Sequence, residues 1–237
     1  MRVLATTLAA LCLAGSATAD ILDDFEDGSM SEYLIGSGTF NNANISGAHA
    51  HDGALGLGFL QGSGPMFYYR NDVTTSAGNR YFAYVRSNVG SAGGAAAGRV
   101  YMGVDAGPGG AITAVFAPNT PATGLLLQNN SGWGFVTVGQ VAANYAANTW
   151  YLLELNWVGV GQMQARVWDE TGNTLIADTG VLGVPSLGGG GLALRGFTTG
   201  TAALNSIDTI YENAIPAPSV LALLGLAGLS IRGRRRQ

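Results

Sequence analysis

Apolar and polar residues alternate along most of this chain with a period of two, which is the period of a β-strand and not the 3.6 of a helix. The clearest segment is TWYLLELNW at 149–157, in which one face is apolar: Tyr151, Leu153, Leu155 and Trp157. The next segment, QMQARVWD at 162–169, alternates in the same way and turns Met163, Ala165 and Val167 inward. Only the short turn VGVG separates the two segments, so the pattern predicts a β-hairpin.

Similar short segments follow one another from ALGLGFL at 54–60 to SIDTIYE at 206–212. Turn sequences such as DAGPGG and NNSG separate them, and no long helical pattern or fixed-period repeat interrupts the series. Ten or more short strands in a body of this length predict an all-β fold, an antiparallel β-sandwich of the jelly-roll type spanning 20–213.

The first 19 residues have the composition of a secretory signal. Arg2 precedes an apolar stretch, and Ala17 and Ala19 form an A-x-A cleavage site before Asp20. The single cysteine, Cys12, lies inside this leader. The mature body, which we expect to begin at Asp20, therefore cannot form a disulfide or a thiolate metal site.

The last segment, 214–237, combines a proline pair, a short apolar run and a basic end. The run from Val220 to Ile231 is 12 residues long, whereas a stable membrane span needs roughly 20. We expect a short hydrophobic helix that inserts into the membrane only transiently. The residues that flank the run are Pro216, Ala217 and Pro218 before it, and Arg232, Arg234, Arg235 and Arg236 after it.

This order of Pro-x-Pro, apolar run and arginine cluster resembles the PEP-CTERM sorting signal, although the usual middle residue of that family is Glu and here it is Ala217. The resemblance implies an exosortase-type sorting enzyme as a partner. It also implies secretion across the inner membrane to the cell surface or extracellular matrix of a bacterium that makes extracellular polysaccharide.

The charge of the body differs from that of the whole chain. All 15 acidic residues but only six of the 11 arginines lie between Asp20 and Glu212, and there is no lysine, so the body has a formal charge of −9 against −4 for the chain. An acidic surface argues against nucleic acid as a partner and leaves neutral glycans, cations and proteins open.

Most of the body resembles the concanavalin A-like, laminin-G-like sandwich. The resemblance rests on ILDDFEDGSMSEY at 21–33, HDGALGLGF at 51–59, the hairpin at 149–169 and NSIDTIYE at 205–212. It implies that the first and last strands meet, that an exposed sheet face binds glycans, and that a structural calcium ion is bound.

The residues argue against catalysis. The E-x-D-x-x-E pattern of glucanases with this fold is missing, Glu154 is the only acidic residue within its strand, and Asp169 and Glu170 belong to a turn. His49 and His51 are spaced to share a face and bind a metal, or they lie in a loop. We therefore expect a protein that is not an enzyme.

Two binding sites are expected instead. Oxygen ligands suit Ca²⁺, and we expect Asp24, Glu26 and Asp208 to hold it with backbone carbonyls of the HDG turn; the alternative is a solvated acidic strand end. Aromatic faces stack on sugars, and arginine donates hydrogen bonds to hydroxyl groups. The candidates for glycan binding are therefore the outward-facing residues Arg99, Tyr101, Trp133 and Trp168. The alternative is that these side chains are buried.

The sequence thus favours a non-enzymatic surface or matrix protein that binds extracellular polysaccharide. The alternatives are a structural protein that associates with itself and a divergent glycoside hydrolase.

Overall fold

The computed structural model describes residues 19–38, 43–59, 67–90, 98–118, 120–197 and 205–214. The predicted secretory signal 1–19, except Ala19, and the predicted sorting tail 214–237, except Ala214, lie outside the described residues, as does most of the GSAGGAAAG segment.

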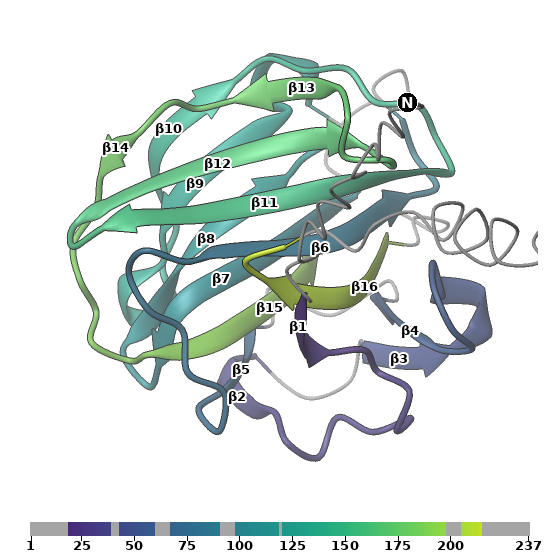
Figure 1. Cartoon of the computed structure of the whole chain (residues 1–237), viewed down its shortest axis with the longest axis horizontal. Coiled ribbons are helices and arrows are strands. Elements are labelled where there is room, and N and C mark those ends of the chain that lie inside the picture. The colour runs from purple at the N-terminus through teal and green to yellow at the C-terminus, as the bar shows by residue number, and fades with distance from the viewer. Residues whose placement is uncertain are drawn as a thin grey trace, which may run out of the picture.

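The described chain forms two antiparallel sheets packed face to face (Figure 1). Sheet A has nine strands in the order β13-β12-β11-β6-β16-β4-β3, with β1 also pairing with β16 and β14 with β12. Its strands are β1 Asp20–Asp23, β3 Ala43–Ser46, β4 Gly56–Phe59, β6 Arg80–Ser87, β11 Thr149–Gly159, β12 Gln162–Asp169, β13 Leu175–Asp178, β14 Leu182–Gly183 and β16 Asn205–Glu212.

Sheet B has seven strands in the order β10-β9-β8-β7-β15-β5-β2. They are β2 Leu34–Ser37, β5 Phe67–Arg70, β7 Arg99–Gly107, β8 Gly110–Phe116, β9 Leu125–Asn129, β10 Val136–Val141 and β15 Gly191–Phe197. The helices of the described residues are short 3-10 turns: η1 Gly47–His49, η2 Pro121–Thr123 and η3 Ser131–Trp133. None of them is long and apolar enough to cross a membrane.

The core lies between the sheets and is filled by the side chains that the alternation turned inward. In sheet A, Leu153 of β11 pairs with Val167 of β12 and with Ala83 of β6, and all three are fully buried. Burying these apolar side chains supplies most of the stabilisation that a body without disulfides can draw on. The predicted β-sandwich, the hairpin and its inward faces are confirmed.

The first and last strands meet as expected, because β1 pairs with β16. β1 ends at Asp23, so the rest of the acidic segment DDFEDG lies outside the strand. Backbone amides of the following residues turn back onto acidic side chains, with Phe25 N donating to Asp23 Oδ1 at 2.9 Å and Glu26 N donating to Asp24 Oδ1 at 3.1 Å. These Asx-type turns compete with the sheet ladder and end the strand.

Candidate functional site

The segment 47–55, which connects β3 to β4, carries two histidines to sheet A and is held there by acidic side chains. Asp208 of β16 accepts hydrogen bonds through Oδ2 from the amide of His51 at 2.6 Å and from that of Asp52 at 2.9 Å. Glu26 Oε1 accepts from the amides of Ala54 at 2.7 Å and Leu55 at 2.9 Å. The connection is therefore fixed both to the last strand and to the N-terminal segment.

The two histidines occupy different environments and do not form a pair. His49 is buried, its Nδ1 lies 2.8 Å from Ser206 Oγ, and burial together with the charge of Arg86 lowers its pKa. It fits because β4 has glycine at position 58, where a Cβ would lie 2.0 Å from His49 Nε2. His49 is thus a neutral packing residue of the connection.

His51 lies on the outer face of sheet A among aromatic rings. Its ring stacks on Tyr84 at a centroid distance of 3.6 Å and meets Trp150 edge-on at 5.2 Å. Its Nδ1 lies 3.1 Å from Asp52 Oδ2 and its Nε2 lies 3.1 Å from Glu170 Oε1, so it joins the connection to the β12–β13 turn. Burial, together with the charges of Asp52 and Glu170, raises the pKa of Tyr84 to about 12.

Two half-buried tryptophans lie on this same outer face. Leu152 of β11 pairs with Trp168 of β12, and Trp150 lies two positions before Leu152, so the two indoles flank one leucine on adjacent strands. The Arg86 guanidinium lies 4.5 Å from the ring centroid of Trp150. We call this group the tryptophan face; it consists of His51, Tyr84, Arg86, Trp150 and Trp168.

A fully buried carboxylate lies beside the tryptophan face. Glu154 of β11 has no exposed area, and its Oε2 accepts from Trp168 Nε1 at 2.7 Å. Its Oε1 accepts from Arg80 Nε at 2.8 Å and from Arg166 Nη1 at 3.3 Å. A carboxylate enclosed by two guanidinium groups and an indole acts as a counter-charge and not as an accessible acid or base.

The expected calcium ligands are only partly brought together. Asp24, Glu26 and Asp52 line one small pocket of about 150 Å³. Asp208 does not line this pocket, and its carboxylate oxygens accept hydrogen bonds from backbone amides instead. In the part of the chain that the structure describes, no three His, Cys, Asp or Glu side chains are close enough together to hold a metal ion. Calcium binding stays a prediction.

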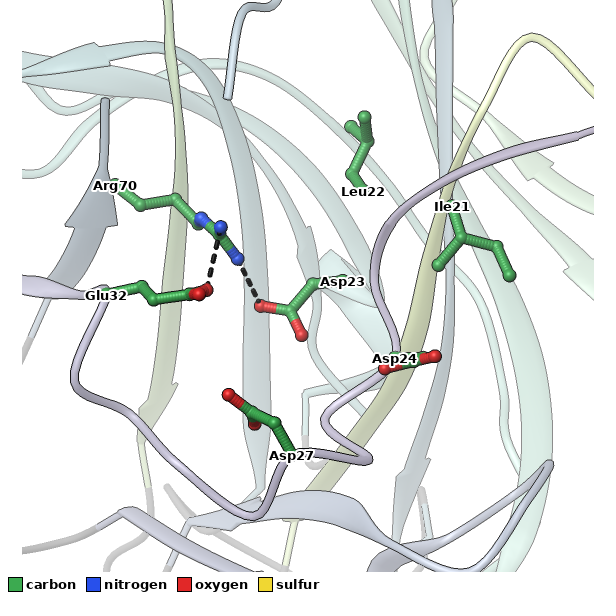
Figure 2. A pocket seen from close by; sticks show the side chains of 7 residues that line it. All are labelled: Ile21, Leu22, Asp23, Asp24, Asp27, Glu32 and Arg70. Carbon is green, nitrogen blue, oxygen red and sulfur yellow. Dashed lines mark hydrogen bonds and ion pairs between the residues drawn. The ribbon is translucent and has the colours of Figure 1, made fainter. Parts of the chain in front are cut away.

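A larger pocket of about 400 Å³ surrounds Arg70. Figure 2 shows the guanidinium between Asp23 and Glu32, at 3.0 Å and 2.7 Å, with Asp24 and Asp27 at the rim. Hydrogen bonds to Asp72, at 2.7 Å and 2.9 Å, raise the pKa of Arg70. These ion pairs fasten the segment after β1 to β5 of sheet B.

Three of the four expected glycan residues lie on the outer face of sheet B, away from Trp168. Tyr101 and Trp133 are 2% and 9% exposed, and the ring of Phe67 packs against both, at 5.8 Å and 5.0 Å. The η3 turn covers this face, since Asn130 Oδ1 accepts from Thr113 Oγ1 of β8 at 2.6 Å. Half-buried Arg99 belongs to the same face, so the four candidates do not form one site.

No family model and no curated protein matches this chain. Among solved structures, it is similar to the carbohydrate-binding module CBM66 from Bacillus subtilis, with a TM-score of 0.53, 10% identity, and coverage of 78% of this chain and 98% of that one. The lectin UEA-II complexed with galactose has a TM-score of 0.53, 8% identity and coverage of 83% and 98%. A Bacillus subtilis protein of unknown function with a galectin-like fold has a TM-score of 0.51, 14% identity and coverage of 83% and 98%.

At these identities the likeness concerns the fold. The chain is an antiparallel β-sandwich whose fold resembles those of lectins and of galectin-like proteins.

Proposed function

We propose that this protein is a non-enzymatic carbohydrate-binding module and that it binds polysaccharide on the tryptophan face. The observation that carries the proposal is the pair of half-buried indoles, Trp150 and Trp168, on one face of adjacent strands. Aromatic side chains present a large apolar surface at low conformational cost, and sugar rings have apolar C–H faces that stack on them. Arg86 and the rim carboxylates of Asp52 and Glu170 add donors and acceptors for hydroxyl groups.

The outer face of sheet B supports this function less well. Its aromatic rings pack against one another, and they leave little ring surface for a ligand. Phe135, the residue two positions after Trp133, is the aromatic there with a large exposed fraction, 47%. It therefore provides a matched control for the other face.

The experiment is a binding screen of the exported protein on neutral, amino and acidic polysaccharides, with Trp168→Ala, Trp150→Ala and Phe135→Ala. Loss of one stacking ring costs about tenfold in affinity. We expect that loss for the two tryptophan variants and unchanged binding for Phe135→Ala. Binding that survives both tryptophan substitutions would move the site elsewhere, and binding to no polysaccharide would remove the function.

The location of this module is also a proposal, and the sequence signals at the two ends support it. We propose that the leader is cleaved after Ala19 and that an exosortase-type enzyme processes the tail after its transient insertion in the membrane. The product would be a bacterial cell-surface or matrix protein. Mass spectrometry of the protein from the cell surface tests this, because an intact N-terminus or an intact arginine cluster would contradict it.

A structural calcium ion is a further part of the proposal. The pocket of Asp24, Glu26 and Asp52 brings carboxylates from two segments to the edge of the tryptophan face, since Tyr211, which lines the pocket, also contacts Tyr84. These carboxylates surround the pocket without converging, so a bound ion would take its remaining ligands from backbone oxygens and water.

A second candidate function is self-association through the edges of sheet B. Its edge strands β2 and β10 contain no charged residue and expose Leu34, Ile35 and Val136 at 46%, 44% and 60%. Uncharged edges of this kind are templates for strand pairing between copies. Sedimentation of the exported protein over a hundredfold range of concentration tests this, and a monomer throughout would exclude it.

A further inference from the structure

The Glu154 carboxylate is buried at a place where burial is unusual. It projects from the outer face of sheet A, yet it has no exposed area, whereas its neighbours Trp168 and Arg166 are half-buried. A buried charge is costly unless each of its oxygens has donors. The structure meets that condition through side chains that cover the carboxylate from three directions.

Two of these partners, Arg80 and Arg166, are each held in turn by a second contact. The Arg80 guanidinium lies 4.8 Å from the ring centroid of Phe82. Arg166 Nε donates to Asp178 Oδ2 at 3.1 Å, and Asp178 Oδ1 accepts from Gln164 Nε2 at 2.7 Å. The network therefore has fixed ends on β6 and β13, and Glu154 lies in its middle.

The bond to Trp168 decides what that indole can offer a ligand. An indole has one polar atom, the Nε1–H donor, and in this protein the donor is directed at Glu154 Oε2 at 2.7 Å. The hydrogen bond also restricts rotation of the ring, because a turn about χ2 would leave both the donor and the buried carboxylate oxygen without a partner. What remains for a ligand is the flat π-surface, held in one plane.

We infer that Glu154 is the positioning residue of the tryptophan face, and that it restricts Trp168 to stacking on neutral pyranose rings with an apolar C–H face. This inference rests on the proposed function. Glu154 does not touch the ligand; it acts through the indole plane. The ligand class follows because the ring offers no donor to a carboxylate or sulfate and because the body has a formal charge of −9.

The positioning role is tested first without any ligand. In the ¹⁵N-labelled exported protein each tryptophan gives one indole N–H signal, and Trp168→Phe assigns that of Trp168. We expect this proton to exchange with solvent at least about tenfold more slowly than that of Trp150, for which no hydrogen bond is formed within the described residues. Equal exchange at the two indoles would overturn the inference.

Glu154→Gln and Glu170→Gln form the matched pair for the same measurement. We expect Glu154→Gln to shift the Trp168 signal and speed its exchange about tenfold, since a neutral amide is a weaker acceptor and binds the two arginines less well. Glu170→Gln changes a carboxylate that contacts His51 and not Trp168, so it should leave the signal in place. A Trp168 signal that is unchanged in Glu154→Gln would overturn the positioning role.

The ligand arm uses galactan as the neutral probe and polygalacturonate as its acidic counterpart. We expect Glu154→Gln and Trp168→Phe each to weaken galactan binding about three- to tenfold, with no further loss in the double variant, because both act through one indole plane. Additive losses would show that Glu154 acts independently of Trp168. Preference for polygalacturonate would overturn the ligand class. Binding to neither polymer would also remove that class, whereas the polysaccharide screen decides the proposed function and the exchange experiment decides the positioning role.

Discussion

Asp208 on the last strand binds the backbone of His51, 157 residues earlier in the chain, through a hydrogen bond of 2.6 Å. Its other carboxylate oxygen accepts from the amide of Thr209 at 2.8 Å, so both oxygens are used. The carboxylate is fully buried, and it fixes the connection that carries the His51 ring onto Tyr84 and beside Trp150. The geometry of the tryptophan face therefore depends on a residue that is not part of it.

Replacing Asp208 by Asn should destabilise the protein by about 2 kcal/mol, the range for hydrogen bonds to a buried charged group. The Asn amide would direct N–H groups at backbone N–H donors whichever way it is oriented. Chemical denaturation measures the change in the free energy of unfolding. Asp52→Asn, at a side chain that is 52% exposed, is the control and, in the presence of chelator, should change it by less than about 0.5 kcal/mol. Equal effects of the two substitutions would contradict this role of Asp208.

Gly58→Ala should also destabilise the protein, because the new Cβ would lie 2.0 Å from His49 Nε2. Overpacking of this kind costs about 1–3 kcal/mol. Gly183→Ala is the matched control, since a Cβ at that position meets nothing within 4 Å and its φ is not left-handed. Thermal unfolding of the two variants compares them, and a Gly58→Ala protein as stable as the control would show that His49 moves freely.

The fold was predictable because its information is local. Each strand of the hairpin 149–169 carries its own alternation, and the buried set of Tyr151, Leu153 and Leu155 follows directly from it. The end of the first strand was not predictable in the same way. Whether Asp23 and Asp24 bind amides of the next residues or continue the sheet depends on the competing partners in the folded protein.

The candidate site was predictable only in part. Alternation correctly turned Trp168 and Tyr101 outward from the core, but it does not tell whether another segment covers an outward side chain. Phe67, Phe135 and Arg195 pack against Tyr101, and all three come from segments distant in the sequence. Trp150 was missed, and so was the packing of His51 against it, because these contacts join segments far apart in the sequence and are specified by strand order.

Arg70→Lys should loosen the N-terminal segment. The guanidinium, 9% exposed, binds Asp23, Glu32 and Asp72 together, and a lysine ammonium cannot reproduce the paired bonds to Asp72. We expect a loss of about 2 kcal/mol, below the range for a fully buried pair because Glu32 and Asp72 are half exposed. Hydrogen exchange should show faster amides in 20–33, with no change in β12 or β13. Unchanged exchange in 20–33 would show that the ion pairs do not fasten this segment.

Asp178 should make stability depend on pH in the acid range. Burial by itself raises the pKa of this carboxyl, but hydrogen bonds from Gln164, the Gly180 amide and Arg166 outweigh it and hold the pKa below its ordinary value. A carboxyl whose pKa is lowered in the folded state stabilises the protein fully at a pH above its pKa in the unfolded chain, about 3.9. This stabilisation is lost as the pH falls below that pKa toward the lower folded pKa. The free energy of unfolding of the wild type should therefore fall from pH 5 to pH 2.5. The free energy of unfolding of Asp178→Asn should fall less steeply over this range. Equal slopes for the wild type and the variant would exclude Asp178 as a source of the pH dependence.

Calcium should stabilise the protein if the proposed pocket binds it. At a Ca²⁺ concentration about 100 times Kd, a ligand specific for the folded state adds about 2.7 kcal/mol, which corresponds to about 5–10 °C in Tm for a body of this size. We expect that rise relative to chelator in the wild type and its loss in Asp52→Asn, which removes a carboxylate lining the pocket. Asp27→Asn is the matched control, because Asp27 lines only the neighbouring Arg70 pocket and should keep the response. Equal Tm values with calcium and with chelator would leave the three carboxylates as acceptors for amides and solvent, and Asp208 and Glu26 would then hold the connection 47–55 without a metal ion.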